Sequence, residues 1–393
     1  MSTDSRTWVR VGLGMFVLAF GANLFAPLLL SYRAEVGLTQ PQVTFLLAVY
    51  VLGLVPALLI GGPLSDVKGR RAMIRPALIL GGVGSAILAL GAGGSFLALS
   101  VGRLVAGTAI GLIMAAGAAW LQELSTGPAH LGARRATVAL SLGFGGGPLL
   151  AGLIAEFLPH PHLLPYLVHI VLLTLIAPLV WRTPGGAPRP GVERRALFSR
   201  SVLSRHFLFA VAAWAPWGFG AVATSFAVLP ALVDDSLTWP VAFTGLVVAV
   251  TMGTGVLIQP LVSRFGSDLV PPATLGLGFV ILGMLAATAV AVTGSPWLVF
   301  PAAVLLGAAY GVMMVSGLRE VQIIAPPREL GAATAVFYSL TYVGFFVPLV
   351  LSYLGPLLGY PPLFLGGAVI AAVSIGPVVH IARGRGSARP PQR

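Results

Sequence analysis

Residues able to do chemistry are few in this sequence, which limits the reactions open to it. Only 9% of its 393 residues are charged and none is cysteine, so disulfides, thiolate nucleophiles and cysteine-bound metals are excluded. No H-E-x-x-H, no G-x-S-x-G and no phosphate-binding loop ending in G-K-[ST] is present. We therefore expect no enzyme, no metal site and no nucleotide-driven motor within the chain.

Arg103 is the one charged side chain placed well inside an apolar run, residues 96–121. In a helix that crosses a membrane it would lie roughly 10 Å deep. An arginine at the centre of a span costs about 2.5–3.5 kcal/mol on insertion scales, so such a charge is by default a functional hypothesis. The alternative is an arginine that extends its guanidinium to the outer interface. All the Asp and Glu residues fall in loops or near a predicted membrane face.

These groups must be positioned by helices that cross a bilayer. With 57% hydrophobic residues and a mean hydropathy of +0.96, the chain cannot cover itself with a water-soluble surface. A span needs about 20 mostly apolar residues. The sequence predicts an all-α membrane protein with twelve spans, at 11–31, 42–61, 74–93, 96–121, 136–158, 163–181, 206–231, 239–262, 270–293, 297–318, 331–355 and 361–382.

The basic residues orient these spans. All of the 23 Lys and Arg residues except Arg33 and Arg103 fall on one side of the membrane when the N-terminus is placed inside. Cytoplasmic loops carry such an excess, so we predict an inner (cytoplasmic) membrane location with both termini cytoplasmic. Topology then accounts for the net charge of +12, and nucleic acid is not an expected partner.

The chain also contains a repeat. Residues 182–205, rich in Pro, Gly and Arg, are predicted to be a cytoplasmic linker between six-helix bundles at 1–181 and 206–393. Small or helix-bending residues recur at an offset of about 200; the pairs are Gly107 with Gly307, Gly111 with Gly311, and Pro148 with Pro348. Secondary transporters are commonly built from such repeats, with the substrate site near the midplane between them.

A loop motif gives the first family resemblance. Residues 62–71 read G-P-L-S-D-V-K-G-R-R, which is similar to the G-x-L-x-D-x-x-G-R-R signature of the major facilitator superfamily. The matching positions are Gly62, Leu64, Asp66, Gly69, Arg70 and Arg71. The resemblance implies the fold of that superfamily, a loop that latches the two halves on the cytoplasmic side, and a working monomer. The alternative is an ordinary basic turn that serves topology only.

Span five resembles a motif of one branch of that superfamily, the drug and proton antiporters. Its matching residues are Gly143, Gly147, Pro148 and Gly152. Small residues at this spacing let a neighbouring helix approach closely, and proline bends the span. The resemblance implies export, whereas the alternative is generic packing of small residues.

The same resemblance predicts the substrate cavity, lined by spans one, four, seven and ten. The candidates there are Asn23, Arg103, Trp120, Trp214, Trp217 and Tyr310. Trp214 and Trp217 are three residues apart and are expected on one helical face, beside Pro216, where the helix is expected to flex. Asp234 and Asp235, at the outer mouth of span seven, are candidates for proton exchange or solvated loop residues. His169 is assigned to packing, since the family places span six at the periphery.

Together these features predict a secondary active transporter that works by alternating access. An aromatic cavity with few polar groups suits export of lipophilic or cationic small molecules, with no cofactor and with protons or another ion as the energy source. The alternative is a carrier of an anionic or neutral metabolite, with Arg103 as the anion-binding residue. A receptor or channel would predict neither the repeat nor the latch loop.

Overall fold

The computed structural model describes residues 7–125, 130–184, 199–265, 272–326 and 329–387. Over these ranges the chain is helical and contains no strand. Twelve helical segments are long and apolar enough to cross a membrane, which confirms the predicted spans. Residues 185–198 of the predicted linker lie outside the described ranges.

Nine of the twelve described spans contain one α-helix each, two of them with a short 3-10 turn at one end, and three are divided. The first six spans consist of α1 (Thr7–Asn23) with α2 (Phe25–Val36), α3 (Gln40–Lys68), α4 (Arg70–Leu90), α5 (Phe96–Leu124), α6 (His130–Phe157) and α7 (Leu164–Trp181). The last six consist of α8 (Arg205–Phe207), η3 (Leu208–Ala212) and α9 (Trp217–Ala227), then α10 (Pro240–Phe265), α11 (Pro272–Thr293), α12 (Val299–Ile324), α13 (Leu330–Val343) with η7 (Gly344–Phe346) and α14 (Val347–Leu358), and α15 (Tyr360–Ser387).

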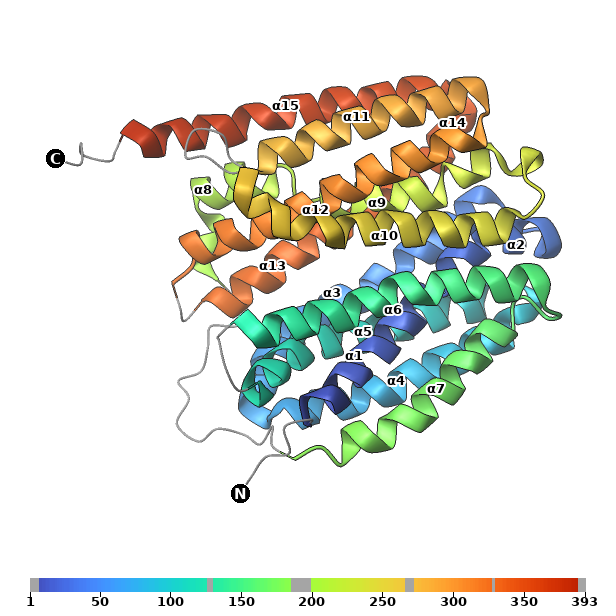
Figure 1. The fold of residues 1–393 in the computed structure, drawn as a ribbon, viewed down its shortest axis with the longest axis horizontal. Coiled ribbons are helices and arrows are strands. Elements are labelled where there is room, and N and C mark those ends of the chain that lie inside the picture. Colours follow the sequence, from blue (N-terminus) through green and yellow to red (C-terminus); the bar gives the residue numbers. More distant parts are fainter. Residues whose placement is uncertain (1–6, 126–129, 185–198, 266–271, 327–328, 388–393) are drawn as a thin grey trace. The chain divides into compact units, whose positions relative to one another are not determined.

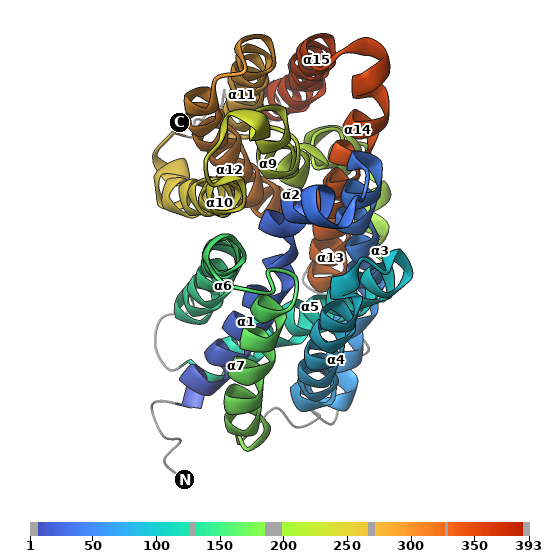
Figure 2. The ribbon, with the colours of Figure 1, turned by 90° about the vertical axis from the view of Figure 1, so that its right-hand side faces the viewer.

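Internal contacts divide the chain into two units. Unit 1 comprises Met1–Leu197 and Trp239–Ala249, and unit 2 comprises Phe198–Thr238 and Val250–Arg393. Within unit 1, α5 packs along α3 and α4, and α1 packs along α6 and α7 (Figure 1). Within unit 2, α11 packs along α12 and α15 (Figure 2). By this division the start of α10 belongs to unit 1. The boundaries predicted for the two six-helix bundles, 1–181 and 206–393, differ from this division and stay a prediction.

Each of the three divided spans changes its helical course four residues before a proline. Proline has no backbone N–H and therefore leaves the carbonyl group four residues earlier without its helical donor. Accordingly α1 ends four residues before Pro27, the π-helical η3 ends four residues before Pro216, and η7 begins four residues before Pro348.

The repeated glycines make the same helix crossing in each unit. A Cβ built on Gly107 of α5 would overlap the backbone carbonyl oxygen of Tyr50 on α3. A Cβ built on Gly307 of α12 would overlap that of Thr251 on α10. Each helix pair therefore approaches backbone to backbone at a position that only glycine permits.

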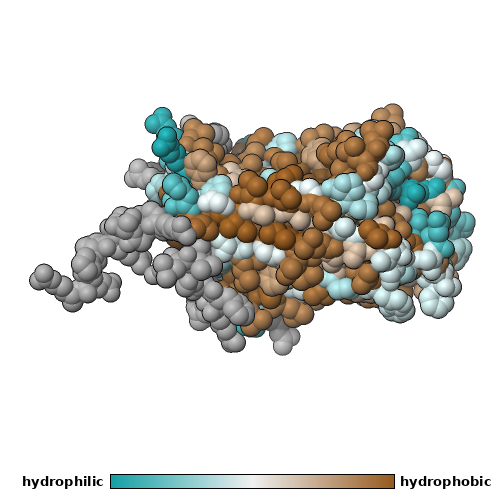
Figure 3. Space-filling model, turned by 90° about the horizontal axis from the view of Figure 1, so that it is seen from above, coloured by the Kyte–Doolittle hydropathy of each residue, from teal (hydrophilic) through white to brown (hydrophobic). Residues whose placement is uncertain are grey.

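Apolar side chains also cover the outside of the helices. Figure 3 shows hydrophobic residues over the middle of the face in view, with hydrophilic residues towards its ends. Large apolar side chains such as Leu257 (77% exposed) and Trp297 (79% exposed) point outward. Surfaces of this kind are stable against lipid rather than against water.

Candidate functional site

The loop motif lies at a sharp turn between α3 and α4. Lys68 ends α3 and Arg70 begins α4, with Gly69 between them at φ 89°. Only glycine adopts this left-handed backbone readily, which explains its place in the motif. Beside the turn, Arg71 donates to the backbone carbonyl oxygen of Thr183, beyond the end of α7.

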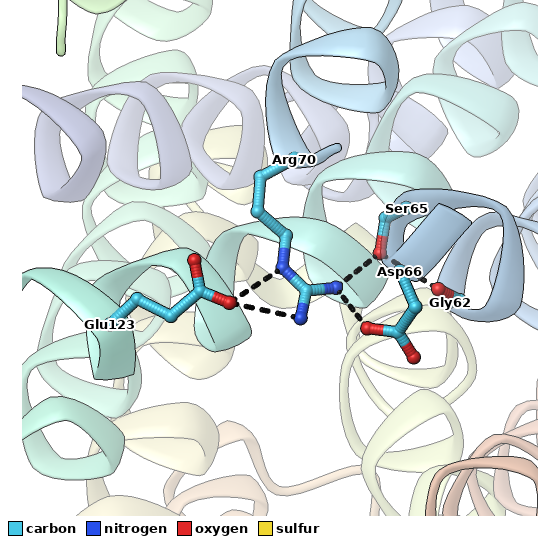
Figure 4. A network of polar contacts seen from close by, with 5 residues as sticks. All are labelled: Gly62, Ser65, Asp66, Arg70 and Glu123. Atoms are coloured by element: carbon cyan, nitrogen blue, oxygen red, sulfur yellow. Dashed lines mark hydrogen bonds and ion pairs between the residues drawn. The ribbon is translucent and has the colours of Figure 1, made fainter. Parts of the chain in front are cut away.

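Arg70 is the centre of a polar network at this turn (Figure 4). Its guanidinium lies 2.6 Å from the Asp66 carboxylate and 3.1 Å from the Glu123 carboxylate. It also donates to Ser65 Oγ at 2.6 Å, and Ser65 Oγ donates to the Gly62 carbonyl oxygen at 2.7 Å. The motif thereby ties α3 and α4 to the end of α5. Sequence reasoning missed Ser65 and Glu123; no spacing rule pointed to Glu123, 53 positions after Arg70.

Arg103 is enclosed within unit 1. Its side chain is 2% exposed; Nε donates to the Leu46 carbonyl oxygen at 3.0 Å and Nη1 to the Ala22 carbonyl oxygen at 2.9 Å. The guanidinium carbon also lies 4.9 Å from the Phe25 ring centroid and 4.4 Å from that of Tyr50. Arg103 therefore does not extend to an interface, and it holds α5 against α3 and the first span.

Asn23 lies at the division of that first span. It is the last residue of α1, and its Nδ2 donates to the Phe144 carbonyl oxygen on α6 at 3.3 Å. Asn23 and Arg103 thus act on adjacent positions of the same break, because Arg103 bonds to the neighbouring Ala22 carbonyl group.

Trp120 on α5 is buried at 1% exposure. Its indole Nε1 has no hydrogen-bond partner among the residues that the structure describes. Buried tryptophan N–H groups usually find an acceptor, so this donor is a candidate contact for a bound molecule.

The glycines of span five allow two helices to pack closely against α6. A Cβ on Gly143 or Gly147 would overlap the backbone of α1, at the carbonyl oxygens of Phe16 and Phe20. Near the end of α6, a Cβ on Gly152 would lie 2.9 Å from the Val241 carbonyl oxygen, at the start of α10 within unit 1. Pro148 lies inside α6. The motif therefore serves close packing on both sides of α6.

In unit 2, the aromatic candidates belong to a larger cluster. Tyr310 on α12 lies 5.1 Å from Phe219 on α9, between ring centroids. Phe219 in turn stacks on Tyr342 at 4.3 Å and lies 5.2 Å from Phe345. Phe219 is the centre of this cluster, which sequence reasoning missed because phenylalanine occurs in most of the spans and nothing in the sequence singles out this one.

The two tryptophans of span seven do not share one regular helical face as expected. Trp214 is fully buried; its Nε1 donates to the Ala210 carbonyl oxygen at 2.6 Å and its ring meets Phe337 edge to face. Trp217 instead reaches Gly367 on α15. The reason is that the chain between η3 and α9 is a turn, which includes Pro216.

Asp234 and Asp235 lie in a short 3-10 turn, η5 (Asp234–Ser236), before α10. Asp235 is exposed, and its backbone N–H donates to the Asp234 carboxylate at 3.1 Å. Span seven does not extend as a helix to include them.

His169 on α7 is buried, and both of its ring nitrogens have partners. Nδ1 lies 2.6 Å from Ser85 Oγ and Nε2 lies 3.0 Å from the Val17 carbonyl oxygen. These contacts agree with a packing role.

These features define a polytopic α-helical membrane protein of twelve spans. A family model described as the Major Facilitator Superfamily matches residues 11–348, and the chain belongs to that superfamily. It is therefore a secondary transporter of a small molecule.

Solved structures with the same fold include other transporters. A mutant of a peptide transporter, POT, matches with a TM-score of 0.75 and 14% identity over 96% of this chain and 95% of that chain. A mutant of the nucleoside transporter NupG matches with a TM-score of 0.73 and 12% identity, over 96% and 99%. At these identities the likeness shows the fold alone. A search of the curated proteins finds no match to the chain.

Proposed function

We propose that this transporter exports lipophilic or cationic small molecules by alternating access, driven by a proton gradient, as a monomer in the inner membrane with both termini cytoplasmic. The observation that carries the proposal is the character of the buried side chains. Within the described spans, no buried side chain is acidic, and the buried titratable or charged ones are Arg103 and His169 together with tyrosines. Binding energy must then come mainly from apolar and aromatic contact.

The Phe219 cluster (Phe219, Tyr310, Tyr342 and Phe345) is the group of rings that we assign to substrate binding. Its rings come from α9, α12, α13 and η7, so one ligand would touch three spans at once. Aromatic faces attract organic cations by about 0.5–2 kcal/mol per ring, and they also accept apolar groups. Both properties favour the proposed substrate class.

The alternative, an anionic metabolite held by Arg103, has less support. Arg103 already donates to two backbone carbonyl groups, and Phe25 and Tyr50 lie close to its guanidinium. An anion would have to displace these backbone and aromatic contacts of the guanidinium. Because proteins of this fold include peptide and nucleoside transporters, a neutral metabolite is retained as the second substrate class in the experiment.

The test compares accumulation of a fluorescent lipophilic cation, a small organic acid and a nucleoside in cells with and without the protein, at neutral and mildly acidic external pH. We expect lower accumulation of the cation alone, reversed by a protonophore. Phe219→Leu and Tyr310→Phe should raise KM for the cation several-fold, about 1 kcal/mol of lost contact. Trp297→Phe, at an exposed position, is the matched control and should behave as wild type. Equal cation levels with and without the protein would contradict the proposal, and selective movement of the acid or the nucleoside would replace it.

A further inference from the structure

Three polar side chains meet at the end of unit 1 opposite the Arg70 turn. Ser31 on α2 lies between the other two: its Oγ donates to the Glu35 carboxylate at 2.7 Å and lies 2.8 Å from His162 Nε2. His162 is in the segment between α6 and α7 and is 7% exposed, whereas Glu35 is exposed. We call Ser31, Glu35 and His162 the His162 cluster.

The order of these groups excludes a hydrolytic triad. In a triad the carboxylate orients the histidine, and the histidine removes the proton of the serine. Here the carboxylate accepts from the serine instead, and Ser31 is 2% exposed. The neutral histidine fits this arrangement as the Nε2–H tautomer, which donates to Ser31 Oγ while Ser31 donates to Glu35. No described residue is hydrogen-bonded to Nδ1 of His162.

The cluster is joined to Arg103 by stacked rings. The His162 ring stacks on Tyr32 at 4.4 Å between centroids, and Tyr32 stacks on Phe25 at 5.4 Å. The far end of this column is the Arg103 guanidinium, 4.9 Å from the Phe25 centroid. Tyr32 Oη also lies 3.4 Å from Tyr166 Oη on α7. Through these contacts α2, the part of the first span beyond the break, is held against α7 and the segment before it.

We propose that His162 is the proton-binding residue of the transport cycle, and that proton uptake there releases α2 from α7. This inference rests on the proposed proton-driven transport. The step adds one proton from water to Nδ1 of His162, gives the ring one positive charge, and breaks no covalent bond. The neutral cluster holds α2 against α7. The cluster with a protonated His162 favours a conformation in which the imidazole ring is hydrated.

The direction of the pH dependence follows from the surroundings of the His162 ring. Burial lowers the pKa of His162 below its usual range, while the Glu35 carboxylate acts in the opposite direction. A conformation that hydrates the ring has the higher pKa, so protons favour that conformation. The conformation in which α2 is held against α7 is thus fully populated at neutral and alkaline pH, and it is lost as the pH falls through the pKa of His162.

Other charged or titratable groups at this end are few. Besides Glu35 of the cluster, they are Tyr32 and Arg33 on α2, Tyr166 on α7, Glu156 at the end of α6 and His160 in the same segment as His162. Glu156 accepts from the backbone N–H groups of Val241 and Ala242 at 2.8 and 2.9 Å. His160 is the natural control, since it has the same chemistry but makes none of the contacts of the cluster.

The first experiment reads the position of α2 without any substrate. Because the chain has no cysteine, a single spin label can be placed on α2 by Ala34→Cys, at an exposed position. We expect an immobile label at alkaline pH and a mobile one at acidic pH. His162→Gln should keep the label immobile throughout, His160→Gln should leave the transition unchanged, and Glu35→Gln should move its midpoint to lower pH, by about one unit or less. The same transition in His162→Gln as in wild type would overturn the inference.

A second experiment separates this inference from the proposed function. In liposomes, His162→Gln should lose about tenfold or more of cation transport driven by a pH gradient, and it should keep substrate exchange without a gradient within about twofold. If wild type moves no cation, the proposed function fails, while the label still decides whether His162 controls α2. If His162→Gln couples protons normally, the coupling residue is elsewhere.

Discussion

Replacing Gly107 by alanine tests the helix crossing on which the fold of unit 1 depends. The new Cβ would overlap the Tyr50 carbonyl oxygen and lie 3.1 Å from the Leu54 amide nitrogen. Overpacking costs roughly 1–3 kcal/mol, and we take about 3 kcal/mol because the obstacle is backbone. Alanine regains about 1 kcal/mol of helix propensity over glycine. The expected net loss is about 2 kcal/mol, which lowers the thermal midpoint by roughly 4–8 °C for a unit of about 200 residues.

The assay heats the detergent-solubilised protein and measures the remaining monomer peak by size-exclusion chromatography. The thermal midpoint is the temperature at which half of that peak is lost. Gly307→Ala should show the same fall, since its Cβ would overlap the Thr251 carbonyl oxygen in unit 2. The matched control is Gly146→Ala in α6, where a Cβ would have no heavy atom within 4 Å. That variant should be unchanged or slightly more stable. If Gly107→Ala and Gly146→Ala have equal midpoints, the close crossing of α3 and α5 is not what requires glycine.

Three further predictions concern polar contacts. Arg70→Ala should cost less than about 1 kcal/mol because its ion pairs with Asp66 and Glu123 are partly exposed, yet it should slow transport several-fold; an unchanged transport rate would refute a gating role. Glu329→Gln should lower the thermal midpoint at neutral pH but not in acid. Hydrogen bonds, first from Ser199 and then from Ser201, lower the pKa of Glu329, so its stabilisation is present above the unfolded pKa and is lost as pH falls; an equal effect at both pH values would contradict this. His169→Phe should cost about 1–3 kcal/mol by leaving buried partners unpaired, and an unchanged midpoint would argue against the packing role.

Most of the architecture could be predicted from the sequence. Lipid demands continuous apolar helices, so hydropathy alone located all twelve spans. Most of the observed bounds lie close to the predicted ones, whereas the second and tenth spans run on to Lys68 and Ile324, beyond the predicted ends at 61 and 318. The repeat was visible as Gly107 and Gly307, and it corresponds to a real equivalence of packing. The α3–α4 turn was predictable because Gly69 has a backbone conformation that few other residues adopt.

The partners of the site residues could not be predicted. Glu123 meets Arg70 only because α5 packs on α4, and a sequence pattern within one helix carries no information about the next. The same holds for Ser31 and His162, which are 131 positions apart. The shared face of Trp214 and Trp217 was wrong because periodicity assumes an unbroken helix; Pro216 removes a backbone donor, and the expected flexing there is a full turn before Trp217.

The role of Arg103 follows from that same proline rule applied to the first span. Pro27 leaves the Asn23 carbonyl group without its helical donor, and α1 ends there. Arg103 donates to the neighbouring Ala22 carbonyl oxygen, and Asn23 donates to α6. The buried charge is therefore used to join helices around a break, with backbone carbonyl groups and aromatic rings in place of a carboxylate. Arg103 is the one buried arginine among the described residues, and with its donors used in this way the transporter must find its substrate contacts in other groups. The buried Nε1 of Trp120, which has no hydrogen-bond partner in the described part of the chain, is a donor of that kind in unit 1.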